Sequence, residues 1–201
     1  MRLALAVALA VLGGLVLALL AATTTLDGLD GGLSGALSTF RSRPWLHVAV
    51  WITGLGASPA VAVAALIATA FLWASSRWRE IAALWMVWAG AELTSWTLKD
   101  LLGRPRPQFL DIASASSFSF PSGHAAMSMA IYGFLAYAIA RGMPSNRRRR
   151  AVVACAVILI LTIGFSRIFL SVHHTSDVLG GFAVGGIWCL LGIAACRAGR
   201  G

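Results

Sequence analysis

Long stretches without charged residues constrain this chain more than any other feature of its sequence. Only 11% of its 201 residues are charged and 59% are hydrophobic, whereas a soluble domain carries roughly a quarter charged residues. A helix that crosses a bilayer needs about 20 mostly apolar residues, and charge-free stretches of that size recur along the chain. The composition therefore excludes an ordinary water-soluble globule and predicts a polytopic membrane protein.

The apolar stretches predict an all-α fold, a bundle of six transmembrane helices in a single domain over residues 1–201. The expected spans are approximately 3–22, 46–74, 81–100, 122–140, 151–171 and 177–196. The first stretch is longer than the apolar part of a signal peptide and lacks a small-x-small cleavage site, so we expect a span and not a leader. Gly54, Gly56 and Pro59 are residues that the second span can tolerate. The connector 23–42, rich in Gly, Ser and Thr, is expected to be a surface loop with one interfacial turn at most.

The distribution of positive charge predicts the orientation of these spans. The chain has 16 Lys and Arg against 7 Asp and Glu, an excess that in a soluble protein suggests a nucleic-acid partner. Six spans place both termini on one side, and ten of the 16 basic residues, including the run 147–150, fall there. Because cytoplasmic loops are enriched in Lys and Arg, we expect cytoplasmic termini and no nucleic-acid partner. Arg41 and Arg43, on the other side, are explained as cations that reach lipid headgroups.

Further cations lie at predicted span ends that share the side opposite to the termini. Lys99 ends the third span, Arg106 follows it, and Arg167 lies near the end of the fifth. A cation within a span costs about 2.5 to 3.5 kcal/mol at the bilayer centre on insertion scales, so these groups need partners or an anionic ligand. Ser122 and Gly123, at the entry to the fourth span, add free backbone N–H groups at the positive end of a helix dipole. This combination favours phosphate, whose oxygens match arginine guanidinium groups.

Histidines and a carboxylate belong to the same set of span ends. His173 and Asp177 stand four residues apart, so on a helix the carboxylate can accept a hydrogen bond from one ring nitrogen. That bond leaves the other nitrogen free to attack, and we therefore expect His173 to be a nucleophile that Asp177 orients. His174 has Val178 at the equivalent spacing and is expected at the rim of the site. His124, at the start of the fourth span, is placed to protonate a leaving oxygen.

A metal site is the alternative use of such a histidine cluster. His124, His173, His174 and Asp177 could supply ligands, but three neighbouring cations would repel a divalent ion. The three cysteines lie in apolar runs without CxxC spacing and are expected to be core residues. We therefore expect no metal.

Three ordered motifs run through these residues. They are KDLLGRPRP from Lys99 to Pro107, PSGH from Pro121 to His124, and SRIFLSVHHTSD from Ser166 to Asp177. The pattern resembles the three-part signature of the type 2 phosphatidic acid phosphatase superfamily, the integral-membrane lipid phosphate phosphatases, with every signature position met.

The resemblance implies a role for each matching residue and no metal or cofactor. The phosphate-binding residues are then Lys99, Arg106, Ser122, Gly123 and Arg167, and the catalytic ones are His173, His124 and Asp177. It further implies a lipid phosphate or diphosphate phosphatase that works through a phosphohistidine and whose partners are its lipid substrate and the bilayer. The compact size favours a bacterial enzyme, expected in the cytoplasmic membrane. The distribution of the basic residues, with cytoplasmic termini, places the expected active site outside the cytoplasm.

Several alternatives remain open at this point. Undecaprenyl diphosphate, phosphatidic acid and phosphatidylglycerol phosphate are all candidate substrates. A phosphotransferase using the same phosphohistidine, a non-enzymatic anion or lipid transporter, and, more remotely, a haloperoxidase are the alternative functions. Arg104, outside the signature, is expected to be a peripheral contact, and Glu92 to be structural or protonated. The segment 114–119 is either a flap or a plain loop, and the Gly-rich run 180–186 packs either within the bundle or between subunits, so the oligomeric state stays open.

Overall fold

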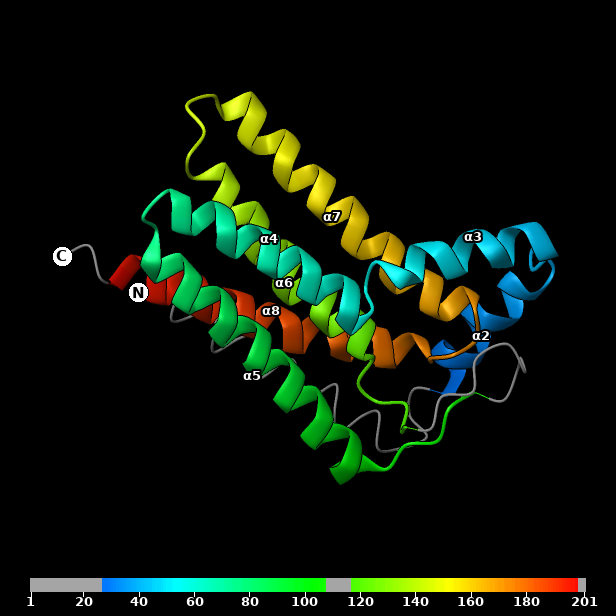
Figure 1. Cartoon of the computed structure of the whole chain (residues 1–201). Helices are drawn as coiled ribbons and strands as arrows, with labels where there is room; N and C mark the ends of the chain where they lie inside the picture. The colour runs from blue at the N-terminus through cyan, green and yellow to red at the C-terminus, as the bar shows by residue number, and fades with distance from the viewer. Residues whose placement is uncertain (1–26, 108–116, 199–201) are drawn as a thin grey trace.

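The structure is a computed structural model that describes residues 27–107 and 117–198, and every regular element among them is an α-helix (Figure 1). The helices are α2 (Asp27–Ser38), α3 (Arg43–Gly54), α4 (Ser58–Ala74), α5 (Trp78–Leu102), α6 (Gly123–Ala140), α7 (Asn146–Phe169) and α8 (Thr175–Ala198). The predicted all-α class is therefore confirmed. The first predicted span, 3–22, lies outside the described residues, so the count of six spans stays a prediction.

Among the described helices, three are long and apolar enough to cross a bilayer on their own. They are α6, α7 and α8, and the bent pair of α3 and α4 meets the same criteria as one unit. Helix α5 covers the predicted span 81–100 and is 25 residues long. Glu92, Lys99 and several Trp and Thr residues make it less apolar than the other four.

The predicted second span, 46–74, is wrong as one continuous helix. The chain breaks between α3 and α4, which are bent by 43°. Pro59 lies in the first turn of α4, a position that suits proline because the first N–H groups of a helix have no intrahelical partner. Gly56, in the break, packs closely: a Cβ atom there would lie 2.5 Å from Ile163 Cγ2 and 3.3 Å from the His124 carbonyl oxygen. The break therefore lets the chain pass directly beside the start of α6.

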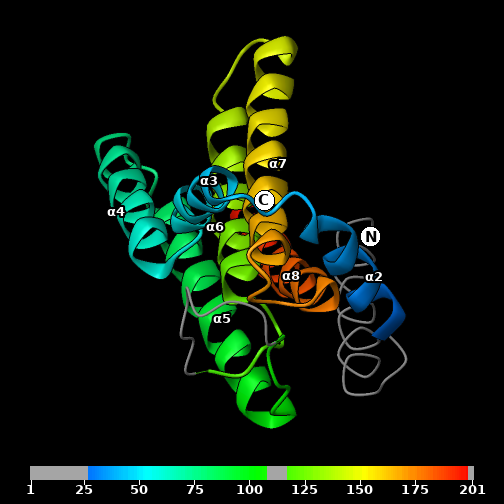
Figure 2. The same ribbon diagram turned by 90° about the vertical axis from the view of Figure 1, so that its right-hand side faces the viewer.

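The connector 23–42 contains helix α2, where a surface loop was expected. Its sequence, DGLDGGLSGALS, is a poor helix former because glycine costs about 1 kcal/mol relative to alanine. Contacts with the rest of the protein hold it: α2 lies beside α7 and the first turns of α8 (Figure 2), where Leu37 packs on the buried Phe169 and Leu170. Tertiary packing therefore overrides the local preference.

Arg41 is also placed differently from the prediction. Its Nε donates to the Phe169 carbonyl oxygen at 2.8 Å, and its Nη2 donates to the Ser34 carbonyl oxygen at 3.1 Å. The last carbonyls of a helix lack intrahelical partners, so Arg41 caps α7 and ties α2 to it. Lipid-headgroup contact is therefore the wrong explanation for this residue.

Helix α6 lies at the centre of the bundle, in contact with α4, α5, α7 and α8. Its Ile131 and Phe134 are fully buried in a core cluster with side chains of α4, α5 and α8. Large apolar side chains elsewhere point outward, including Ile67, Trp96 and Ile158. An outward apolar surface of this extent suits a protein whose surroundings are lipid.

Glycines on α8 allow that helix to approach α6 closely. A Cβ atom on Gly181 would lie 2.5 Å from the Ser122 carbonyl oxygen, and one on Gly185 would lie 2.2 Å from the Ala126 carbonyl oxygen. The Gly-rich run 180–186 therefore packs within the bundle, one of the two alternatives left open by its sequence.

The helices bring the motif segments to one end of the molecule. Helices α4, α6 and α8 begin at that end, α5 and α7 end there, and α2 and α3 lie across it (Figure 1). The connectors that join α5 to α6 and α7 to α8 therefore meet at the same place.

Candidate active site

The segment after α5 carries the first motif and is held by main-chain contacts. Helix α5 ends at Gly103, whose φ of 56° is left-handed and suits glycine, which has no Cβ to clash. The chain then runs extended, and Ser119 N donates to the Arg104 carbonyl oxygen at 2.8 Å. Lys99 Nζ donates to the Phe118 carbonyl oxygen at 2.7 Å, and Arg106 Nε to the Ser117 carbonyl oxygen at 2.8 Å. The two cations are thus fixed against the 117–119 segment.

His173 and Asp177 lie where α7 gives way to α8. Ser171 adopts a left-handed φ of 51° just after α7, and His173 follows in the short connector. Asp177, in the first turn of α8, accepts a hydrogen bond from the His174 backbone N–H at 2.8 Å, as the third residue of a helix often does in a capping box. His173 Nδ1 lies 3.5 Å from Asp177 Oδ2. The structure thus brings this predicted pair together.

Arg106 identifies which ring nitrogen of His173 carries the lone pair. Its Nη1 donates to the Val172 carbonyl oxygen at 2.9 Å and lies 3.2 Å from His173 Nε2. A guanidinium group can only donate hydrogen bonds, so Nε2 is the acceptor and the ring proton is on Nδ1, facing Asp177. Nε2 is therefore the nitrogen available as a nucleophile.

His173 is buried, and this fixes its charge. Burial, opposed by the hydrogen bond with Asp177 and aided by the charges of Arg167 and Arg106, lowers the pKa of His173 to about 3. The ring is therefore neutral near pH 7, and its lone pair is not taken up by a proton.

Ser119 belongs to the site, although the sequence did not single it out beyond the segment 114–119. The residue is fully buried; its hydroxyl donates a short hydrogen bond to Asp177 Oδ2 and lies 3.5 Å from His173 Nδ1. Residues 117–119 are therefore part of the wall of the site, whereas 114–116 lie outside the described residues. In the sequence, the one feature that could have indicated Ser119 as a site residue is its position two residues before the PSGH motif.

Arg167 is buried in α7 and points toward α3. Its Nη1 donates to Thr53 Oγ1 at 2.8 Å, a partner that the sequence did not reveal because threonine is common in apolar helices. Among the described residues, Arg167 Nε and Ser122 Oγ are buried without a hydrogen-bond partner. Buried polar atoms are nearly always paired in folded proteins; of the five unpaired ones among the described residues, these two belong to predicted phosphate-binding residues and are available to a polar ligand.

Ser122 and Gly123 lie at the start of α6, as predicted, but the Ser122 backbone N–H is not free. The Ser122 N–H donates to the Asp177 carbonyl oxygen at 2.9 Å, so the expectation that it is free is wrong. This bond joins the second motif to the third. His124, in the first turn of α6, interacts electrostatically with His173 and with all three cations, Lys99, Arg106 and Arg167. The predicted catalytic and phosphate-binding residues are therefore gathered in one region.

Arg104, expected to be peripheral, contacts the catalytic candidate Asp177 directly. Its Nη1 donates to Asp177 Oδ1 and to Ser176 Oγ, and its Nη2 donates to Asp30 Oδ2, each at 2.7 Å. Burial disfavours its charge, but the interactions with Asp30 and Asp177 outweigh this and raise the pKa of Arg104. Both the peripheral placement of Arg104 and the omission of Asp30 are therefore corrected.

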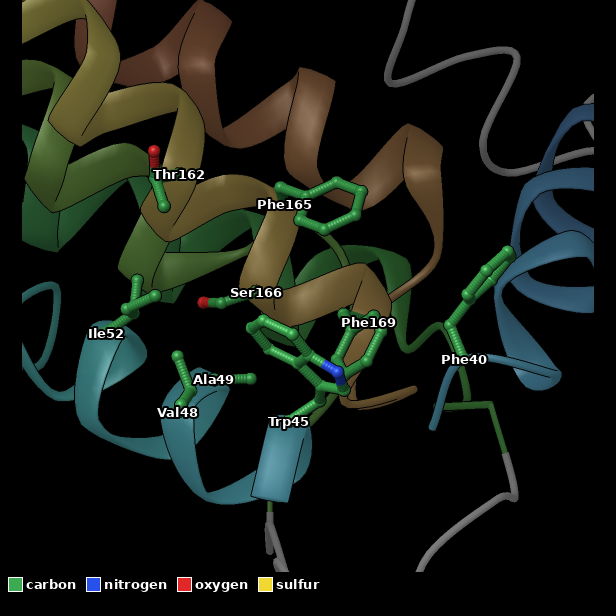
Figure 3. A pocket seen from close by; sticks show the side chains of 9 residues that line it. All are labelled: Phe40, Trp45, Val48, Ala49, Ile52, Thr162, Phe165, Ser166 and Phe169. Carbon is green, nitrogen blue, oxygen red and sulfur yellow. The ribbon is translucent and has the colours of Figure 1, made fainter. Parts of the chain in front are cut away.

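An apolar groove of about 380 Å³ opens between α3 and α7 (Figure 3). Its walls are formed by Trp45, Val48, Ala49 and Ile52 of α3, by Thr162, Phe165, Ser166 and Phe169 of α7, and by Phe40. Ile52 and Ser166 are the immediate chain neighbours of Thr53 and Arg167, which are hydrogen bonded to each other. The groove therefore lies between the same two helices that carry Thr53 and Arg167, although neither of these two residues lines it.

The described residues contain no group of three His, Cys, Asp or Glu side chains arranged to hold a metal ion. His124, His173 and Asp177 lie among cations, and His174 contributes its backbone N–H to Asp177. The absence of a metal from the reaction stays a prediction.

Comparisons with known proteins agree with this arrangement. Residues 80–198 match the PAP2 superfamily. The chain is 33% identical over 174 residues to phosphatidylglycerophosphatase B of Bacillus subtilis, covering 85% of each protein. It is 34% identical over 122 residues to a lipid A 1-phosphatase of Rhizobium etli, covering 54% of this chain and 51% of that one.

A solved structure extends the likeness to nearly the whole chain. The crystal structure of the transmembrane PAP2-type phosphatidylglycerolphosphate phosphatase from Bacillus subtilis superimposes with a TM-score of 0.87 at 29% identity, covering 94% of each chain. Because the superfamily match begins at residue 80, this likeness also covers most of the residues that precede it. The chain therefore belongs to the PAP2 superfamily and is a membrane lipid phosphate phosphatase, as its three motifs predicted.

Proposed function

We propose that this protein removes the terminal phosphate from phosphatidylglycerol phosphate, without a metal, by way of a phosphohistidine at His173. The observation that carries the mechanism is the state of His173: a neutral ring with its proton toward Asp177 and its lone pair on Nε2. Among the three candidate lipids, phosphatidylglycerol phosphate is favoured because the B. subtilis relatives at 33% and 29% identity are named for that activity.

In the first step, His173 Nε2 attacks the phosphorus atom as the bond from phosphorus to the lipid oxygen breaks. His124 takes up a proton when the negative charge of the bound phosphate offsets the three cations around it. It gives this proton to the leaving oxygen, which yields a lipid alcohol, and the phosphoryl group remains on Nε2. The Nδ1 proton stays in its hydrogen bond with Asp177, whose negative charge stabilises the positive charge that the ring acquires.

In the second step, water replaces the lipid oxygen at the same position. His124, now neutral, takes a proton from the water as the water oxygen attacks phosphorus and the bond to Nε2 breaks. The products are inorganic phosphate and neutral His173, so the enzyme returns to its starting state.

The cations stabilise the phosphoryl group in both steps. Arg167 Nε and Ser122 Oγ are two of the five buried side-chain atoms without a hydrogen-bond partner among the described residues, and they are suited to its equatorial oxygens. Arg106 contacts His173 Nε2 in this structure. When phosphate binds, we expect the guanidinium group of Arg106 to contact the phosphate oxygens instead, which leaves Nε2 free to attack phosphorus. Lys99 and the N–H of Gly123 complete the proposed set.

The groove between α3 and α7 suits an acyl chain of the substrate. It is almost entirely apolar, and it is lined by Ile52 and Ser166, whose chain neighbours Thr53 and Arg167 are hydrogen bonded to each other. We infer a lateral path from the bilayer into the site. The concentration of arginines at the opposite end of the molecule, at the start of α7, supports an active site on the extracytoplasmic side with cytoplasmic termini.

Phosphate release from detergent-purified protein tests the proposal. The substrates are phosphatidylglycerol phosphate, phosphatidic acid and undecaprenyl diphosphate, each with and without EDTA and with no acceptor alcohol. We expect the highest kcat/KM on phosphatidylglycerol phosphate, unchanged by EDTA. Activity that requires added metal would overturn the mechanism, and phosphate release only as transfer to an acceptor would identify a phosphotransferase.

His173→Ala and His174→Ala form a matched pair for the nucleophile. The first variant should lose turnover and lose labelling of the protein by phosphate-labelled lipid, while remaining folded in detergent. The second should keep turnover, because alanine retains the backbone N–H that His174 gives to Asp177. Wild-type activity in the purified His173→Ala protein would show that another residue attacks.

A further inference from the structure

Asp30 is a buried carboxylate in an otherwise exposed helix. Its relative exposure is 5%, whereas most residues of α2 around it are exposed. Oδ1 accepts a hydrogen bond from the Ser176 N–H at 2.9 Å, and Oδ2 accepts one from Ser176 Oγ at 2.7 Å. Oδ2 also accepts the 2.7 Å bond from Arg104 Nη2. An unpaired buried charge costs several kcal/mol. The three hydrogen bonds to Asp30 therefore stabilise its carboxylate in this buried position.

Arg104 connects Asp30 to the carboxylate beside the nucleophile. One of its terminal nitrogens contacts Asp30, and the other contacts Asp177 Oδ1. The second oxygen of Asp177, Oδ2, faces His173 Nδ1 and accepts from Ser119 and His174. A continuous chain of contacts therefore leads from α2 through one guanidinium group to the candidate nucleophile.

We propose that Asp30 is a positioning residue for Asp177, which makes α2 part of the active site; this inference rests on the proposed role of His173. Asp30 lies outside both the three motifs and the residues 80–198 that match the superfamily.

Two physical effects give Asp30 this role. First, it holds the second arm of Arg104, so the guanidinium plane stays aimed at Oδ1 of Asp177 and cannot rotate toward the phosphate. Second, it shares the positive charge of Arg104. If Asp30 is replaced by a neutral residue, the positive charge of Arg104 acts on Asp177 alone. The Asp177 carboxylate then stabilises less well the positive charge that the His173 ring acquires on phosphorylation. Both effects act on the transition state more than on the bound substrate, so kcat should fall while KM changes little.

Other contacts dock α2 without touching Arg104, and they supply a control. Ser34 Oγ lies 3.4 Å from Ser171 Oγ and accepts from Arg41 Nη2 at 3.1 Å. Ser34→Ala therefore loosens the same helix but leaves the contacts of Asp30 in place. Asp100 is exposed, and Asp100→Asn controls for the loss of one negative charge near the end of α5.

The experiment compares phosphate release by wild type, Asp30→Asn, Ser34→Ala and Asp100→Asn in detergent. Asparagine keeps the size of aspartate, and gel filtration with thermal unfolding checks that each variant is folded. We expect kcat to fall about tenfold to a hundredfold in Asp30→Asn, with KM within twofold. Both controls should stay within twofold of wild type. Arg104→Gln, which cuts the same connection from its other side, should lower kcat at least as much.

A double-mutant cycle separates positioning from a general loss of structure. If Asp30 acts through Asp177, then Asp30→Asn should not slow an Asp177→Asn enzyme further, whereas independent effects would multiply. A full additional loss in the double variant, or an unchanged kcat in Asp30→Asn, would overturn the proposal while leaving the phosphatase function intact. A wild-type protein that releases no phosphate from any of the three lipids would instead overturn the proposed function, and the role of Asp30 with it.

Discussion

Replacing Gly181 with alanine tests whether the close approach of α8 and α6 sets the geometry of the phosphate site. A Cβ atom at this position would lie 2.5 Å from the Ser122 carbonyl oxygen and 2.8 Å from Ala125 Cβ. The first of these is a main-chain atom, about 0.9 Å nearer than ordinary contact allows, and no side-chain rotation can relieve it. The first turn of α6, which carries Gly123 and His124, must therefore move.

The size of the effect follows from this displacement. Overpacking costs about 1–3 kcal/mol, and the gain of alanine over glycine in a helix returns at most about 1 kcal/mol. We therefore expect the free energy of unfolding to fall by up to about 2 kcal/mol once the helix gain is subtracted. A shift of about 1 Å in a reacting group can lower a rate about a hundredfold, so kcat should fall between tenfold and a hundredfold in Gly181→Ala.

Gly186→Ala, five residues further along α8, is the matched control. Its nearest neighbour would be Met129 Cε at 3.5 Å, an ordinary contact with the end of a flexible side chain. The helix gains the same propensity, so stability should stay level or rise by up to about 1 kcal/mol with kcat unchanged. Thermal unfolding and phosphate release in one detergent compare the two variants. Equal midpoints and equal kcat values would refute the packing argument.

Two further predictions concern the surroundings of His173. Ser119→Ala removes a hydroxyl donor to Asp177 and should lower the free energy of unfolding by about 1.5–3 kcal/mol, with kcat reduced at least tenfold. The control is Ser128→Ala, which should be nearly neutral because the Ser128 hydroxyl donates to a carbonyl oxygen of its own helix. Equal losses in the two variants would contradict the role of Ser119. Because the pKa of His173 is about 3 against about 6.5 in an unfolded chain, the unfolded state binds an extra proton between these values, and stability should fall as the pH drops below about 6.5. The unfolding midpoint should therefore decrease more between pH 7 and pH 5 in wild type than in His173→Gln, and parallel decreases would show that other groups dominate.

The sequence was sufficient to predict the all-α class, the superfamily and the convergence of the motif segments. These depend on local patterns: apolar length, and short motifs in which the chemistry of a residue and its spacing are both visible. The i, i+4 spacing of His173 and Asp177 is of this kind. Span ends alternate between sides, so topology brings the motifs together without any knowledge of packing.

Residues that act through distant contacts could not be found in this way. Asp30 and Ser176 are 146 positions apart, and Thr53 and Arg167 are 114 apart. No local pattern distinguishes Asp30 from any acid in a polar connector. The α3–α4 break was missed because Gly and Pro are tolerated in membrane helices, and whether they bend one depends on what packs beside them. Helix α2 was missed because its stability comes from its neighbours and not from its sequence.

The main-chain hydrogen bonds from Ser119 to Arg104 and from Ser122 to Asp177 join the three motif segments through groups that every residue except proline possesses. A lineage can therefore exchange most side chains around these junctions while the spacing of nucleophile, acid and phosphate ligands is inherited unchanged. The B. subtilis phosphatase is an example of such exchange: its structure superimposes with a TM-score of 0.87, although only 29% of the residues are identical. Divergence in this enzyme is then free to act on the apolar groove between α3 and α7, the proposed site of the acyl chain, because backbone hydrogen bonds hold the motif segments together.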